Sequence, residues 1–123
     1  MAVRKLYTDP ADVSSTISDG GSTANAITAA AGGGQANAVL LSSTYNRVTT
    51  VATAADSVKL PAAKAGSRFY VFNKAAANSL DVFPSTGDNI NALAANAAYA
   101  LAVTKGVGFY CMVDGTWDTI LTA

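Results

Sequence analysis

Residues 99–121 read YALAVTKGVGFYCMVDGTWDTIL, which is three short apolar runs separated by two turn signals. Asp114–Gly115 is a strong hairpin signal, because Asp and Gly tolerate the positive φ that both central residues of a type I′ turn require. Thr104, Lys105 and Gly106 are placed to close the hairpin before it. We therefore expect residues 99–121 to form a three-stranded meander whose register is fixed by its turns.

The same pattern extends back along the chain to about residue 38. Short runs of β-branched, aromatic and aliphatic residues recur between turn signals, which is typical of an all-β fold. An antiparallel β-sandwich, a jelly roll and a small barrel all fit this spacing. The predicted strands are Val39–Leu41, Arg47–Val51, Ser57–Leu60, Arg68–Phe72, Leu80–Phe83, Tyr99–Val103, Val107–Val113 and Trp117–Leu121.

The beginning of the chain has a different composition. Residues 1–36 are rich in Ala, Ser, Thr, Gly and Asp, with only scattered large apolar side chains. Such a segment cannot bury enough apolar surface to fold alone. We expect an extended low-complexity N-terminal arm over residues 1–36, with residues 29–34 as a hinge or linker. Residues 37–123 then form a single β-sandwich or barrel domain.

Several predicted strands carry apolar side chains on both faces. Phe69 and Val71 alternate with Tyr70 and Phe72, and the run over residues 107–113 alternates in the same way. One face can line the core, whereas the second must meet another sheet layer, the arm or a neighbouring subunit. We favour a subunit for at least part of this face. The alternative is a closed fold that buries both faces within one chain.

Composition argues against several classes of function. The 123 residues include eight Lys or Arg and eight Asp, and no Glu, so the net charge is zero and no field attracts nucleic acid. The chain has no histidine, which removes the usual general base and the common zinc ligand. No apolar run reaches the length of a membrane span. We expect a non-enzyme without a cofactor that binds neither nucleic acid nor a membrane.

The aspartates and glycines offer no convincing site. Asp56, Asp88 and Asp114 fall where turns are expected, and turn formation explains them better than catalysis. The stretch GDNIN at residues 87–91 has several oxygen ligands, but it lacks the alternating acids and closing Glu of an EF-hand. The glycines at residues 32–34 lack the Lys-Ser/Thr pair of a phosphate-binding loop. We assign no catalytic, cofactor-binding or metal-binding residue.

Aromatic and sulfur side chains have structural explanations as well. Phe69, Tyr70, Phe72 and Phe83 could stack on bases or sugars at the surface, but without a basic groove beside them core packing is the better explanation. Cys111 has no second cysteine to pair with and is flanked by apolar residues. It is therefore predicted to be a buried, unreactive thiol.

Residues 35–121 contain an ordered set of short motifs. They are NRVTTV at 46–51, DSVKLPAA at 56–63, VFP at 82–84, GDNIN at 87–91, FYC at 109–111 and GTW at 115–117. In this order they resemble a β-rich module of tailed-bacteriophage structural proteins, similar to capsid decoration (cement) or head-fibre proteins. The resemblance covers about two-thirds of the chain.

This resemblance implies a homotrimer on the outer surface of the capsid, made in the host cytoplasm and bound to the shell of the major capsid protein. Its function would be to stabilise the head by packing against the shell. The motifs encode a fold, so they transfer no catalytic residue. The alternative is a head- or tail-fibre or knob protein that binds host-surface glycans through exposed Tyr, Trp and Asn side chains.

Overall fold

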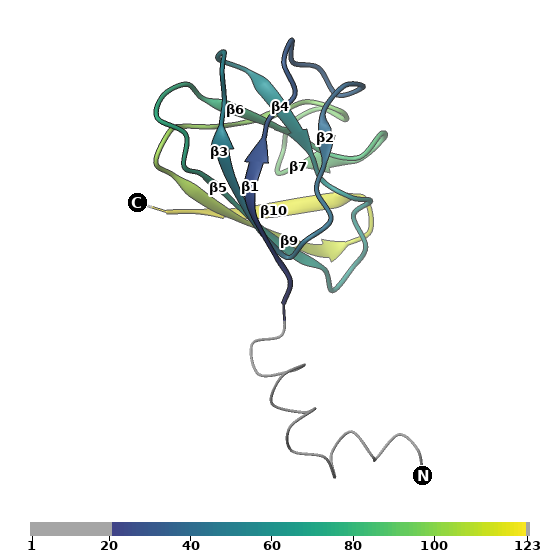
Figure 1. The fold of residues 1–123 in the computed structure, drawn as a ribbon. Coiled ribbons are helices and arrows are strands. Elements are labelled where there is room, and N and C mark those ends of the chain that lie inside the picture. The colour runs from purple at the N-terminus through teal and green to yellow at the C-terminus, as the bar shows by residue number, and fades with distance from the viewer. Residues whose placement is uncertain (1–20, 123) are drawn as a thin grey trace, which may run out of the picture.

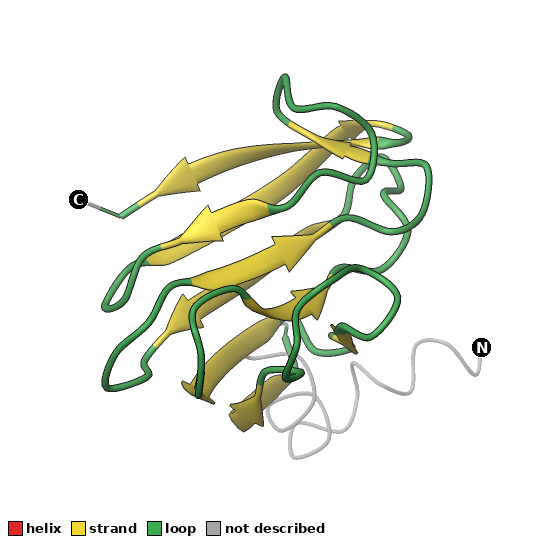
Figure 2. Ribbon diagram, turned by 90° about the horizontal axis from the view of Figure 1, so that it is seen from above, coloured by secondary structure: helices red, strands yellow, loops and turns green. Residues whose placement is uncertain are grey.

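The computed structural model describes residues 21–122, which consist of strands and loops (Figure 2). The all-β prediction is confirmed. No helix in this described part could cross a membrane. The strands are β1 (Thr23–Thr28), β2 (Val39–Leu40), β3 (Tyr45–Thr50), β4 (Asp56–Lys59), β5 (Arg68–Asn73), β6 (Leu80–Phe83), β7 (Asn89–Ile90), β8 (Tyr99–Leu101), β9 (Gly106–Val113) and β10 (Thr116–Leu121).

The strands form two sheets, one with the order β1-β3-β5-β9-β10-β7 and the other with the order β2-β4-β6-β8. From β1 to β6 the chain passes alternately from one sheet to the other (Figure 1). Successive turns therefore stack in parallel, as in a β-solenoid. The expected antiparallel sandwich, jelly roll or barrel is wrong for these strands, and both sheets are mixed. Alternation of side chains is the same in parallel and antiparallel strands, so it does not distinguish them.

The stacked turns repeat their side chains and their hydrogen bonds. Val39, Val58 and Val82 lie side by side on three neighbouring strands of the four-stranded sheet. Valine is β-branched and therefore favours the extended conformation of a strand. The residue that follows β2 and the residue that follows β4 continue this pairing. The N–H of Leu41 donates to the carbonyl oxygen of Lys59, and the N–H of Leu60 donates to that of Phe83, both at 2.8 Å. The solenoid is thus a regular ladder in this sheet.

The core lies between the two sheets and contains the inward side chains of both. Trp117 and Phe109 are its largest members, and both are fully buried. Trp117 meets Phe69 and Phe109 edge to face, with ring centroids 5.8 and 6.5 Å apart. Edge-to-face pairs of this kind add to the free energy of burial.

Residues 99–121 are not a continuous meander. The β9–β10 hairpin around Asp114–Gly115 is confirmed, but only Gly115 has a positive φ, of 90°, so the turn is not type I′. The first strand, β8, pairs with β6 in the other sheet rather than with β9. The next strand, β9, pairs with β5 in the six-stranded sheet. Residues 102–105 therefore connect the two sheets. Leu101 is fully buried in this position.

Part of the expected arm belongs to the β fold. Residues 23–28 form β1, which pairs in parallel with β3 at the edge of the six-stranded sheet. Ala29 is buried in the core, and Ala30 forms a β-bridge with Ser57. Residues 29–34 are therefore no hinge between separate units, and the glycines at 32–34 all take positive φ in the loop that leads to β2. Residues 1–20 lie outside the described residues.

The outward face of the six-stranded sheet

Side chains alternate between the two faces of β5 as predicted, but the core packing expected for Tyr70 and Phe72 is wrong. Phe69 and Val71 lie toward the core, where Val71 is fully buried, and Phe69 packs against the core cluster. Tyr70 and Phe72 alternate with them and so lie on the opposite face. The apolar second face of this sheet is therefore outside the chain's own core.

Register brings aromatic side chains from three strands together on this outward face. Tyr45 of β3 is paired with Tyr70 of β5, and their rings stack with centroids 4.9 Å apart and planes inclined by 8°. Tyr110 of β9 meets Tyr70 edge to face at 5.9 Å. We call Tyr45, Tyr70, Phe72 and Tyr110 the aromatic platform.

Two glycines of β9 allow the rings of the aromatic platform to lie close to the backbone. Gly106 is paired with Phe72, and a Cβ at position 106 would overlap the Phe72 ring. A Cβ at position 108 would lie 2.8 Å from the hydroxyl oxygen of Tyr110. The rings of Phe72 and Tyr110 thus occupy the space that side chains at positions 106 and 108 would fill. This close packing explains why both positions of the GVGFY sequence are glycine.

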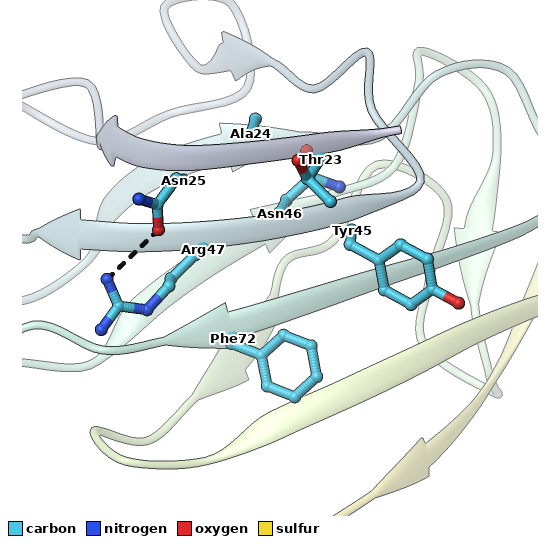
Figure 3. A pocket seen from close by; sticks show the side chains of 7 residues that line it. All are labelled: Thr23, Ala24, Asn25, Tyr45, Asn46, Arg47 and Phe72. Atoms are coloured by element: carbon cyan, nitrogen blue, oxygen red, sulfur yellow. Dashed lines mark hydrogen bonds between the residues drawn. The ribbon is translucent and has the colours of Figure 1, made fainter. Parts of the chain in front are cut away.

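Shallow hollows surround the aromatic platform. One, of about 420 Å³, lies over β1, β3 and β5 and is lined by Tyr45, Arg47 and Phe72 (Figure 3). The Arg47 guanidinium there donates to Asn25 Oδ1 at 3.4 Å. Two others, of about 200 and 490 Å³, are both lined by Tyr70 and Tyr110, the first toward the beginning of β9 and the second toward its end.

Exposed aliphatic side chains border the aromatic platform. Met112 of β9 is 65% exposed and Ile120 of β10 is 67% exposed. Val113, at the end of β9, is also exposed. The edge of β10 pairs with β7 only at Thr116 and Trp117. The face therefore combines aromatic and aliphatic surface with an edge strand that its neighbour only partly covers.

Charged groups of both signs stand on the same face. Arg68 is paired with Tyr110, and Tyr110 is paired with Asp118 on the next strand, so the three form one row. Hydrogen bonding to Tyr110 and, secondly, burial raise the pKa of Tyr70 above its ordinary value.

The aspartates expected in turns do stabilise turns and loops. The Asp56 carboxylate accepts the backbone N–H of Thr53 at 3.1 Å. Asp88 and Asp114 accept the N–H groups of Ala63 and Ala65, each at 2.8 Å, and so hold the loop between β4 and β5. None of the three has a positive φ, and the carboxylates of Asp88 and Asp114 bond to a loop distant in sequence rather than to their own turns.

The GDNIN stretch directs its oxygens to the chain itself. Asn89 Oδ1 accepts from Thr116 Oγ1 at 3.0 Å, and Asn91 Oδ1 accepts from the N–H of Thr119 at 3.1 Å. Among residues 21–122 no three acidic or cysteine side chains gather as metal ligands would. These contacts attach β7 to β10.

Cys111 is buried, as predicted, and its thiol donates to the carbonyl oxygen of Val113 at 3.1 Å. Burial raises the pKa of this thiol. The sequence interpretation did not single out Tyr45, Arg47 or Ile120 for the outward face. Alternation within β3 and β10 could have placed them on one face of each strand, but only the register brings those strands beside β5 and β9.

No family model matches the chain, and searches of curated proteins and of solved structures find no similar protein.

Proposed function

We propose that this chain is a bacteriophage virion structural protein, most simply a capsid decoration (cement) protein that packs as a homo-oligomer on the shell of the major capsid protein. The observation that supports this function is the aromatic platform, whose four rings are half-buried on the outward face, together with the exposed Met112 and Ile120 at its border. The sequence motifs that resemble phage structural proteins favour the same function.

The physical mechanism is burial of apolar surface. Each Å² removed from water contributes about 25 cal/mol, and stable interfaces bury roughly 800 Å² on each partner. The zero net charge of the chain allows many copies to crowd together without strong repulsion. Contacts that are modest in one copy become large when they are repeated over a shell.

The opposite side of the molecule has a different character. The outward positions of the four-stranded sheet include Lys59, Asp81, Ala100 and the half-buried Phe83, whereas Ser57 is covered by residues 30–34. Polar and small side chains of this kind are suited to water, although Leu40 at the sheet edge is exposed. We therefore orient the six-stranded sheet toward neighbouring proteins and the four-stranded sheet toward solvent.

The test uses capsids of the encoding phage that lack this protein. Adding the purified full chain should raise the temperature at which the capsids release DNA. The double variant Tyr70→Ser/Phe72→Ser should lose this protection, whereas Leu40→Ser, an apolar-to-polar change on the other sheet, should keep it. Equal heat resistance with and without the wild-type protein would refute the cement function.

A second candidate is a fibre or knob protein that binds host-surface glycans. The hollow beside Tyr45 and Phe72 favours it, because sugar rings stack their C–H faces on aromatic rings while groups such as Arg47 and Asn25 bond their hydroxyls. The repeated turns also supply the kind of repeat that fibre proteins use. Binding on a glycan array that Phe72→Ala abolishes would support this function, and an array without signal would count against it.

A further inference from the structure

We propose that the aromatic platform binds a second copy of this chain, with Arg68 of one copy paired to Asp118 of the other. The inference rests on the homo-oligomer in the proposed function and specifies its contact surface.

The row of Arg68, Tyr110 and Asp118 carries the argument. Register places the three side by side across β5, β9 and β10, with Tyr110 in the middle. Arg68 and Asp118 are two strand spacings apart, and each spacing is about 4.8 Å, so their backbones are separated by about 10 Å. The two opposite charges therefore lie on either side of the Tyr110 ring. Such a row is complementary to itself, because a positive end and a negative end are present on one surface.

A closed symmetric assembly can pair both charges of every row. In a symmetric assembly every copy supplies one Arg68 and one Asp118, so each charge meets its opposite on a neighbour. Tyr70 and Ile120 lie beside the row and would exclude water from the pair. Complementary charges at an interface of this kind fix the register of the partners and suppress wrong ones.

The balance of charge favours a copy of the same chain over a different partner. A surface selected for an acidic or a basic protein carries predominantly one sign, whereas this face has Arg47 and Arg68 together with Asp118. Arg47 is already hydrogen-bonded to Asn25. Arg47 keeps its positive charge, because Asn25 is neutral, but it lies on β3 outside the row. Within the row Arg68 and Asp118 are one charge of each sign, as a self-complementary contact requires.

The test measures the mass of the full chain by light scattering over a range of concentrations. Wild type should have a mass of at least twice the 12.4 kDa of one chain. Arg68→Asp and Asp118→Arg should each weaken association about tenfold or more, since each places like charges opposite one another. The double variant Arg68→Asp/Asp118→Arg restores opposite charges and should associate within a few-fold of wild type.

Lys59→Asp is the matched control, because it reverses one charge on the outward side of the other sheet, and it should associate like wild type. Thermal melting of each variant shows that it is folded. A monomeric wild type, single variants with the wild-type mass, or a double variant as weak as the singles would each overturn the inference. If wild type is monomeric but still protects capsids from heat, this inference fails while the cement function stands.

Discussion

Asn73 provides the sharpest test of how the two sheets are joined. It is the last residue of β5 and is fully buried. Its Nδ2 donates to the carbonyl oxygens of Asn78 and Leu101, both at 3.1 Å, and its Oδ1 accepts the N–H of Ala75 at 3.2 Å. Since Leu101 belongs to β8, this side chain connects the six-stranded sheet to the four-stranded one.

The expected cost of Asn73→Ala follows from these three bonds. A net contribution of about 1 kcal/mol per hydrogen bond gives a loss of about 3 kcal/mol. Asn46 is an equally buried asparagine on the inward face of the same sheet, with two donor bonds, to Ser43 and Tyr70. Its Oδ1 has no hydrogen-bond partner. Asn46→Ala should lose about 2 kcal/mol in bonds and regain about 1 kcal/mol by removing that acceptor.

The assay is equilibrium unfolding in urea at one fixed protein concentration, with both alanine variants and wild type side by side. We expect Asn73→Ala to reduce the free energy of unfolding about three times as much as Asn46→Ala. Both residues point into the core, so neither substitution changes the outward face. An Asn46→Ala variant that is as destabilised as Asn73→Ala would refute the reasoning from hydrogen-bond satisfaction.

Three further predictions concern other parts of the fold. Gly106→Ala should destabilise by about 1–3 kcal/mol, because its Cβ would overlap the Phe72 ring, and most of this cost should vanish in a Phe72→Ala background; additive losses in the double-mutant cycle would contradict the contact. Burial raises the pKa of Asp81 above 3.8, so its contribution to stability is lost as pH rises through the folded pKa. Asp81→Asn should therefore raise the melting temperature at neutral pH and leave it unchanged well below pH 3.8, and no change at neutral pH would speak against this. Cys111 should react slowly with a thiol reagent in the folded protein and fully in urea, whereas equal rates would show that the thiol is exposed.

The sequence predicted eight of the strands because each carries a local signal. Leu80–Phe83 has the predicted bounds, and β9 begins one residue before its predicted start. The two strands that were missed have weak signals: β1 has one large apolar residue, Ile27, and β7 has two residues. Partners outside the strand supply their stability, since β1 bonds along β3 and β7 along β10.

The buried asparagines were also outside the reach of sequence reasoning. Asn73 ends an apolar run, RFYVFN, where a polar residue suggests a strand end at the surface. Its burial depends on carbonyl groups of residues 78 and 101, which the fold brings to it. No local pattern predicts partners at such separations.

The sequence by itself determined which residues extend as strands, which turns contain glycine or aspartate, and that the strands over residues 68–72 and 107–112 have two apolar faces. Alternation of side chains is a local property of an extended chain, so it can be read from neighbouring residues. Only the tertiary structure decided that the first six strands wind in parallel, that β8 leaves β9 for the other sheet, and that Arg68, Tyr110 and Asp118 share a row. Pairing is a competition among all available strand edges, and its outcome depends on contacts between residues that are far apart in the chain.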